Sequence, residues 1–206
     1  MYTAYIADTP NGRKIPIALE ELALDYRIHR VDLNAGEQKS PDFERLNPNG
    51  KIPVLVDEGS GASLFESCAI LFHLASATGR LMPADDHGRD AVLQWLFLQV
   101  ASVGPMLGQL WWFRHAAPAP NAAALDRYTR ETQRLYGVIE RRLAISRHIA
   151  ADEYTVADIA CYPWLVTYDE LGIDIGEYRA VADWLRRIGA RPAVQRGLDI
   201  ARGTHV

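Results

Sequence analysis

The pattern of hydrophobic and polar residues changes character near residue 80 of this 206-residue chain. Before that point, apolar residues alternate or form short runs, which are typical of strands. We predict strands at 2–7, 26–33, 54–56 and 63–65, with a polar, irregular connection at 36–46. Helical spacing appears in Ile15, Ala18, Leu19, Leu22 and Ala23, and again in Cys68, Leu71, Phe72 and Ala75. The predicted order is therefore strand, helix, strand, strand, strand, helix.

Beyond this first part, apolar residues recur at helical spacing throughout. Leu81 to Ala84 interrupts the pattern and predicts a linker over 81–88. The longest apolar seam consists of Leu125, Tyr128, Thr132, Leu135, Ile139 and Leu143, the spacing of a long helix packed in a bundle. Thr155 to Asp158 has the pattern of a capping box that starts a buried helix. We predict an α/β plus all-α fold: a thioredoxin-like domain at 1–80 and an all-helical bundle domain at 89–206.

Composition narrows the range of partners. With 49% hydrophobic residues the chain can bury a core, and a formal net charge of -4 disfavours nucleic acid as a partner. No run approaches the roughly eighteen consecutive apolar residues of a membrane span, and the N-terminus lacks the order of a signal peptide. We therefore expect a cytoplasmic protein that binds neither nucleic acid nor membrane. Cys68 and Cys161 are far apart in sequence and form neither a dithiol motif nor a metal cluster, so no metal is expected.

The stretch from Asn47 to Ser67 carries the first candidate site. Asn47 to Gly50 is a turn by composition, and Ile52-Pro53 follows it directly. The residue before a proline favours an extended backbone, and a proline belongs at the first residue or edge of a strand. The N–H and C=O of Ile52 are then free to pair with an extended, peptide-like ligand. The same residues are also consistent with an ordinary strand entry.

Glu66 and Ser67 end this stretch at a predicted helix start. The free N–H groups of a helix start favour an anion, so Ser67 can bind a carboxylate through its N–H and its hydroxyl. Glu66 beside it can meet an ammonium group. A ligand that carries an ammonium and a carboxylate at one end would use both residues. Ser67 as a simple N-cap is the alternative interpretation.

Together these features resemble the glutathione site of the glutathione transferase family. The resemblance implies that the bond before Pro53 is cis and that the backbone of Ile52 pairs with the cysteinyl unit of glutathione. It also implies that Glu66 and Ser67 hold the γ-glutamyl end, and that glutathione is the co-substrate. A thioredoxin-like domain followed by a helical domain is the architecture of that family, so the resemblance covers the whole chain.

The loop Thr9-Pro10-Asn11-Gly12 lies where thioredoxin-like proteins place their reactive group, between the first strand and the first helix. It contains neither Cys nor Ser, and Tyr5 falls within the first strand. The Thr9 hydroxyl and Asn11 remain as donors to a thiolate at a helix start. Two hydrogen bonds to a charged group, about 1.5–3 kcal/mol each, cover the about 2.7 kcal/mol that lowers a thiol pKa by two units. Alternatively, Asn11-Gly12 is a turn and Thr9 a helix cap.

Five blocks further resemble the nu class of glutathione transferases, bacterial enzymes that reduce disulfides with glutathione. They are the loop TPNG followed by Lys14, the segment LEELALDY, Gln38, and the segments WLFLQVASVGPMLGQ and EYTVADIACYPW. The resemblance implies that Thr9 and Asn11 face the sulfur and are the catalytic residues. It further implies that the peptide is bound by Asn11, Gln38, Lys51, Ile52 and Pro53.

The resemblance also implies that Arg127 reaches glutathione from the helical domain, in its own subunit or a neighbouring one. From the residues alone, Arg127 belongs with Arg130, Arg134 and Arg141 to a basic stripe typical of a solvated face. Leu110 to His115 is more aromatic than the class pattern leads us to expect. Trp111, Trp112 and His115 either line an apolar pocket for a second substrate or pack at a subunit interface.

The leading hypothesis is a homodimeric glutathione-dependent disulfide reductase, a thiol:disulfide oxidoreductase of the glutathione transferase type that reduces small organic disulfides and, weakly, peroxides. One alternative is conjugation of glutathione to hydrophobic electrophiles at the same site, aided by Trp111 and Trp112. A second alternative is a non-catalytic glutathione-binding or scaffold module, because one fold can carry many functions.

Overall fold

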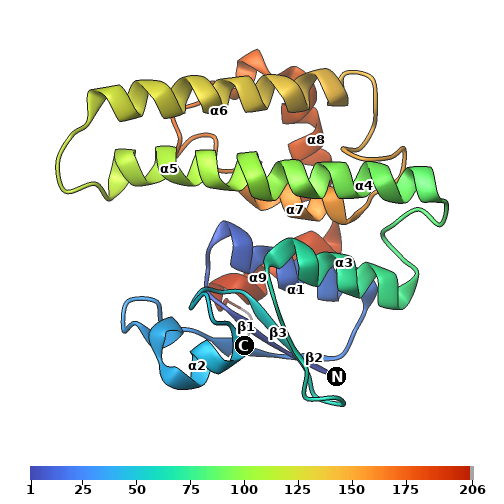
Figure 1. The fold of residues 1–206 in the computed structure, drawn as a ribbon. Coiled ribbons are helices and arrows are strands. Elements are labelled where there is room, and N and C mark those ends of the chain that lie inside the picture. The colour runs from blue at the N-terminus through green and yellow to red at the C-terminus, as the bar shows by residue number, and fades with distance from the viewer. Residues whose placement is uncertain (205–206) are drawn as a thin grey trace. The chain divides into compact units, whose positions relative to one another are not determined.

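The computed structural model describes residues 1–204 and divides into two compact units (Figure 1). The first unit contains residues 1–80 together with the chain from Gly189 onward, and the second contains Leu81–Ile188. The predicted fold class is confirmed: an α/β unit built on one sheet, and a unit that is helical throughout its regular structure. Residues 189–204, which the sequence analysis assigned to the helical domain, pack with the first unit.

A four-stranded mixed sheet forms the centre of the first unit. Its strands are β1 (Tyr2–Ile6), β2 (Tyr26–Arg30), β3 (Val54–Asp57) and β4 (Ser63–Phe65), in the order β2-β1-β3-β4. β1 pairs parallel with β2, whereas β3 pairs antiparallel with both β1 and β4. A parallel pair needs a crossover, and α1 (Pro10–Leu22) supplies it between β1 and β2.

Helices cover both faces of this sheet. α1 packs beside α3 (Ser67–Thr78) on the face where Ala4 and Ile6 are fully buried. The opposite face carries Tyr5, which packs with Phe43 in a smaller cluster that also contains Val31 and Val54. Alternation along β1 therefore sends its side chains into two separate cores.

The connection at 36–46 was predicted to be irregular, and that prediction was wrong. A short 3-10 helix η1 (Glu37–Lys39) is followed by α2 (Pro41–Leu46). Ser40 caps α2 by accepting the N–H of Phe43 at 3.3 Å, and Pro41 occupies the first turn. These are ordinary helix-start signals, but a helix of six residues is too short to show a helical repeat. β2 likewise ends at Arg30 rather than at Leu33.

The last helix, α9 (Pro192–Arg202), packs against α1 in the first unit. An added Cβ at Gly197 would lie 2.6 Å from the backbone of Ile17, so the two helices touch at the main chain. Arg191 donates two hydrogen bonds to Glu21, at 2.6 and 2.8 Å, and Arg30 donates to the carbonyl of Ala201 at 2.8 Å. These contacts fix the C-terminal helix onto the α/β unit.

The second unit consists of helices packed around buried apolar seams. They are α4 (Asp86–Leu98), the π-helix η2 (Gln99–Val103), α5 (Gly104–His115), α6 (Ala122–Leu143), α7 (Val156–Leu165), the 3-10 helix η3 (Ile175–Glu177) and α8 (Arg179–Gly189). Helix α4 starts at Asp86, so the predicted linker 81–88 extends into it. The α6 seam is buried from Thr132 to Leu143, which confirms the predicted long helix.

The start of α7 confirms the predicted capping box. Thr155 accepts the N–H of Ala157 at 3.3 Å, and Asp158 accepts the N–H of Thr155 at 3.0 Å. Asp158 is fully buried and also accepts Ile149 N–H at 3.1 Å and Trp184 Nε1 at 2.9 Å. One carboxylate thereby joins the start of α7 to the preceding loop and to α8.

The continuous helix from Asp86 to His115 is long and apolar enough to cross a membrane, with a mean hydropathy of 1.4 over its best window. The core helix of a soluble protein meets the same criterion, so length and hydropathy alone do not assign this helix to a membrane. Only 33% of that window is buried within the described residues. The helix therefore exposes apolar surface, including Phe97 at 67%.

Candidate functional site

Strand register brings three predicted site segments to one end of the sheet. Tyr5 pairs with Val54 in an antiparallel ladder, so the loop after β1 lies beside the entry to β3. Val54 in turn pairs with Phe65, which places Glu66 and Ser67 at the same end. Thr9 follows β1, Pro53 immediately precedes β3, and Glu66 immediately follows β4. The three residues therefore lie at the same end of the sheet. The topology alone assembles a site from segments that are far apart in the sequence.

Thr9 caps α1 in an extended conformation and accepts the N–H of Gly12 at 3.1 Å. A hydroxyl that accepts from a backbone N–H keeps its own proton for another acceptor. Asn11 follows in the first turn of α1 and is half-buried. The N–H groups of this first turn and the positive end of the helix dipole favour an anion. A thiolate placed here would meet the N–H groups of this turn and the Thr9 hydroxyl as donors.

The turn before β3 is held by Asn47, a residue that sequence analysis read only as part of a turn. Asn47 is 2% exposed, donates to the carbonyl of Lys51 at 2.6 Å and accepts the N–H of Asn49 at 2.9 Å. The bond between Ile52 and Pro53 is cis, as the resemblance implied. Lys51 has an exposed side chain, whereas Ile52 is half-buried and packs against the cluster under the sheet.

Gln38 lies in η1, between β2 and α2. Its Nε2 donates to the carbonyl of Leu33 at 3.4 Å, and its Oε1 is buried without a hydrogen-bond partner within residues 1–204. A buried acceptor without a donor is costly, so a ligand N–H at this position would be favourable. The predicted contact between Gln38 and the peptide part of a ligand stays a prediction.

Glu66 has a backbone conformation that is rare for a residue with a side chain. Its φ is 69° and its ψ is 111°, immediately before the first residue of α3. Such conformations cost about 1–3 kcal/mol and cluster at binding sites, where surrounding structure maintains them. The Glu66 side chain is exposed and caps no helix N–H, so its carboxylate is available to a ligand.

Ser67 is the first residue of α3 and is 5% exposed. Its hydroxyl oxygen accepts from Lys14 Nζ at 3.1 Å. Lys14 comes from α1, is fully buried, and also lies 4.0 Å from Cys68 Sγ. Burial raises the pKa of the Cys68 thiol, although the nearby Lys14 and Ser67 act in the opposite direction. Cys68 is therefore a buried thiol with a raised pKa, which disfavours the thiolate that a nucleophile needs.

Tyr5 does not belong to this edge of the sheet. Its ring lies 4.6 Å from that of His29 and 6.2 Å from that of Phe43, on the face covered by α2. Tyr5 therefore packs in a core on the other side of β1 from α1, and its position within the first strand agrees with the sequence analysis.

The remaining predicted residues lie in the second unit. Arg127 is exposed on α6. Nearby, the hydrogen bond from Arg134 lowers the pKa of Glu131, and the charge of Arg127 adds a smaller effect in the same direction. On α5, Trp111 Nε1 donates to Glu170 at 2.9 Å, and His115 Nε2 contacts the Glu170 carbonyl at 2.8 Å. These two side chains anchor the segment after α7, while Trp112 is 42% exposed.

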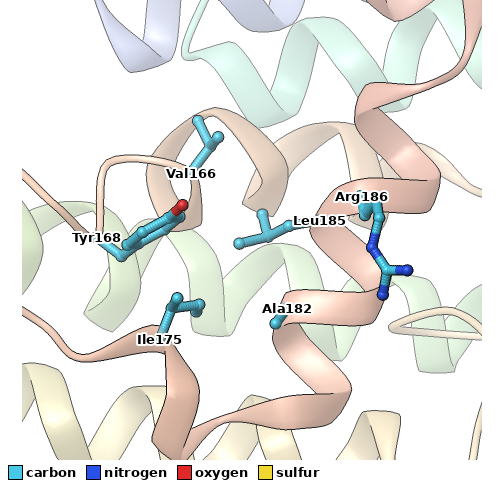
Figure 2. Close-up of a pocket in the computed structure, with 6 residues that line it drawn as sticks. All are labelled: Val166, Tyr168, Ile175, Ala182, Leu185 and Arg186. Atoms are coloured by element: carbon cyan, nitrogen blue, oxygen red, sulfur yellow. The ribbon is translucent and has the colours of Figure 1, made fainter.

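The second unit also contains a cavity of about 340 Å³ near α8 (Figure 2). It is lined by Val166, Tyr168, Ile175, Ala182, Leu185 and Arg186. Figure 2 shows Tyr168, Ile175 and Leu185 around this space, with the Arg186 guanidinium directed away from them. None of the predicted site residues lines it.

Comparison with known proteins gives matches along most of the chain. The family model described as the glutathione S-transferase N-terminal domain matches residues 2–76, and the one described as the C-terminal domain matches residues 95–192. The disulfide-bond oxidoreductase YfcG of Escherichia coli is 48% identical over 203 residues, which cover 96% of this chain and 94% of YfcG.

Two solved structures are similar over nearly the whole chain. A Burkholderia graminis glutathione transferase with two glutathione molecules per subunit has a TM-score of 0.90 and 40% identity, covering 96% of this chain and 87% of its own. A Pseudomonas putida glutathione transferase with one glutathione disulfide per subunit has a TM-score of 0.90 and 38% identity, covering 97% and 91%. This chain therefore belongs to the glutathione S-transferase family, with both of that family's domains present.

Proposed function

We propose that this chain is a glutathione-dependent disulfide-bond reductase of the nu-class type, acting as a homodimer in the cytoplasm without a metal. The observation that carries the proposal is the geometry of Thr9, whose hydroxyl accepts Gly12 N–H at 3.1 Å and keeps its proton for a ligand sulfur. The loop contains no cysteine, so the reactive sulfur comes from glutathione. YfcG, 48% identical, is named a disulfide-bond oxidoreductase.

Glutathione binds along the edge of the first unit in this proposal. Its γ-glutamyl ammonium meets Glu66, and its γ-glutamyl carboxylate meets the N–H and hydroxyl of Ser67. The extended backbone of Ile52 pairs with the cysteinyl unit, and Gln38 and Lys51 contact the peptide. The contact of Arg127 with glutathione, in its own subunit or a neighbouring one, stays a prediction.

The reaction proceeds as two thiol–disulfide exchanges. Bound glutathione, held as a thiolate by Thr9 and Asn11, attacks one sulfur of the substrate disulfide; the S–S bond breaks and the other sulfur leaves as a thiolate. A second glutathione thiolate then attacks the glutathione sulfur of the mixed disulfide, which releases glutathione disulfide and the second substrate thiolate. The relatives crystallised with two glutathiones or with glutathione disulfide support room for this second step.

Turnover of a small organic disulfide by glutathione tests the proposal. Thr9→Ala and Asn11→Ala should each raise the pKa of bound glutathione, read from the pH dependence of turnover, by about one to two units. Asn34→Ala, in the exposed loop after β2, is the matched control and should leave that pKa in place. An unchanged pKa in both site variants would remove Thr9 and Asn11 from the assigned role.

One observation favours conjugation to electrophiles as a second candidate function. Trp111 and Trp112 are 41% and 42% exposed on α5 and could contact an apolar second substrate. Comparing turnover of an aryl halide with that of a disulfide separates the two functions. Faster conjugation than disulfide reduction, reduced by Trp112→Ala, would favour the second candidate.

The homodimer is proposed from the exposed apolar surface of the helix Asp86–His115. Phe97 on this helix is 67% exposed, and Trp111 and Trp112 further along it are 41% and 42% exposed. Several exposed large apolar side chains on one helix are what an interaction surface offers to a partner. Sedimentation of the full chain tests the proposal: we expect a dimer that Phe97→Asp weakens. A monomeric parent chain at micromolar concentration would contradict it.

A further inference from the structure

The one charged side chain that the described residues bury completely beside the candidate site is Lys14, and the proposed reaction gives it no role. Lys14 lies in α1, in the block that follows the TPNG loop. Lysine is almost never fully buried unless its ammonium is paired, because removing the charge from water is costly. The buried ammonium of Lys14 therefore needs hydrogen-bond partners, and Ser67 is one of them.

Hydrogen-bond chemistry gives the Lys14 contact a direction. An ammonium has donors only, so Ser67 Oγ must be the acceptor in the 3.1 Å bond from Lys14 Nζ. The Ser67 hydroxyl therefore cannot donate a hydrogen bond to Nζ, and its own hydrogen is directed at another acceptor. The hydroxyl of Ser67 is in this way set as a donor before any ligand arrives.

A bound carboxylate would compete for that hydroxyl proton with an acceptor already present in the structure. That acceptor is the sulfur of Cys68: burial raises the pKa of this thiol, and a hydrogen bond from Ser67 is one of the causes that act in the opposite direction. A thiol sulfur is a weak acceptor, whereas a carboxylate is charged and forms hydrogen bonds roughly twice as strong as neutral ones. A carboxylate at the start of α3 would therefore accept the hydrogen bond from the Ser67 hydroxyl in preference to the sulfur of Cys68.

We infer that Lys14 is a positioning residue for the γ-glutamyl carboxylate of glutathione: its buried ammonium orients the Ser67 hydroxyl as a donor and places a positive charge behind it. The inference rests on the proposed function, because it assigns the γ-glutamyl end to Glu66 and Ser67. Lys14 acts on the ligand in two ways. It orients the Ser67 hydroxyl, and its positive charge attracts the carboxylate that this hydroxyl binds. The selectivity of the site for a carboxylate at this position depends on it.

Binding of two ligands by calorimetry tests the inference. One ligand is glutathione; the other is 4-aminobutyryl-cysteinylglycine, which keeps the amine of the γ-glutamyl unit but lacks its carboxylate. The variants are Lys14→Met, which removes the charge, and Lys14→Arg, which keeps it. Arg80→Met is the matched control, because Arg80 donates to carbonyls of Leu22 and Glu21 at the other end of α1.

We expect Lys14→Met to weaken glutathione binding about 10- to 100-fold, the range for a lost hydrogen bond to a charged group. Its affinity for the analogue should match that of the parent chain within about twofold, because no carboxylate is present to lose. Lys14→Arg should recover part of the loss, and Arg80→Met should change neither affinity. Equal weakening of both ligands by Lys14→Met, or no weakening of glutathione, would overturn the inference.

The same measurements separate failure of this inference from failure of the proposed function. If the parent chain does not prefer glutathione over the analogue, or does not reduce disulfides, the proposed function fails regardless of Lys14. If the parent chain does both and Lys14→Met keeps the preference, only the inference about Lys14 fails.

A second measurement on the parent chain covers the case in which Lys14→Met does not fold. The nitrogen resonance of the Lys14 ammonium, assigned with Lys14→Arg, should shift when glutathione binds and shift much less when the analogue binds. An identical response to both ligands would overturn the inference without any measurement on Lys14→Met.

Discussion

An added Cβ at Gly12 would lie 2.0 Å from the carbonyl oxygen of Ala7, so the first turn of α1 packs directly against the end of β1. No side chain larger than hydrogen fits there without moving the backbone. Thr9 lies between these two residues, and its hydroxyl accepts the N–H of Gly12. The position of the proposed thiolate donor is therefore fixed by a close contact between two backbone segments.

Gly12→Ala should destabilise the chain by about 1–3 kcal/mol, the usual cost of overpacking. Turnover should fall by more than the loss of folded protein explains. The reason is that a shift of about 1 Å at the start of α1 displaces Thr9 and Asn11 from the sulfur of glutathione. Chemical denaturation and disulfide reduction measure the two effects. Gly137→Ala within α6 is the matched control: with only Arg141 Nη1 at 3.5 Å, it should stabilise the chain by about 0.5–1 kcal/mol. Equal effects of the two substitutions would contradict the close-contact argument.

Glu66 should lower the stability of the folded chain and raise its affinity for glutathione. Glu66→Gly removes the backbone cost of a φ of 69°, so we expect stability to rise by up to about 1–3 kcal/mol less the entropy that glycine adds to the unfolded chain. Glutathione affinity should fall about tenfold through loss of the carboxylate that meets the ammonium. Glu66→Gln keeps the backbone cost and removes the charge, so it should lose affinity without gaining stability. A Glu66→Gly variant that binds glutathione as tightly as the parent chain would argue against the assigned contact.

The two-part fold was predictable because its signals are long or repeated. Strand alternation and helical seams each extend over several turns or strands, and the α6 seam is buried from Thr132 to Leu143 as predicted. Local signals of cap and turn chemistry also sufficed at Thr155 and Asp158. What could not be predicted was α2, whose six residues show start signals at Ser40 and Pro41 but no repeat.

Long-range packing was the other gap in the sequence-based prediction. Helix α9 has the same kind of apolar face as the helices before it, so periodicity could not indicate that it packs on Ile17 in the first unit. Lys14 carried a readable signal, because it lies three and four residues before the buried Ile17 and Ala18 on one face of α1. Its contact with Ser67 joins two helices far apart in sequence, which spacing within one helix does not reveal.

Cys68 should be dispensable for catalysis, because the proposed nucleophile belongs to glutathione. Cys68→Ala should keep disulfide turnover within about threefold of the parent chain. Burial raises the pKa of this thiol, so above about pH 8.5 the unfolded state releases the proton first and stability falls as pH rises. The variant should lose this part of the slope of unfolding free energy between about pH 8 and 10. A loss of turnover beyond about a hundredfold, with the fold intact, would indicate a protein thiol as nucleophile.

Asp158 should be the most sensitive single carboxylate of the helical unit. It accepts from Thr155 N, Ile149 N and Trp184 Nε1, and Asn at this position replaces one acceptor oxygen with a donor. Leaving buried donors without an acceptor should cost about 2–5 kcal/mol in the free energy of unfolding. Asp183→Asn is the matched control, since Asp183 forms only an exposed ion pair with Arg186 and should change stability by less than about 0.5 kcal/mol.

The pH dependence of stability provides a second signature of Asp158. Burial raises the pKa of this carboxyl, so above about pH 4 the unfolded state has released a proton that the native state still holds. Stability should therefore fall as pH rises from about 4 toward the native pKa, and Asp158→Asn should remove that part of the slope. Denaturant titrations of both chains across this range measure it. An unchanged slope in the variant would show that other carboxyls carry the dependence, even if the loss of stability at neutral pH is as large as expected.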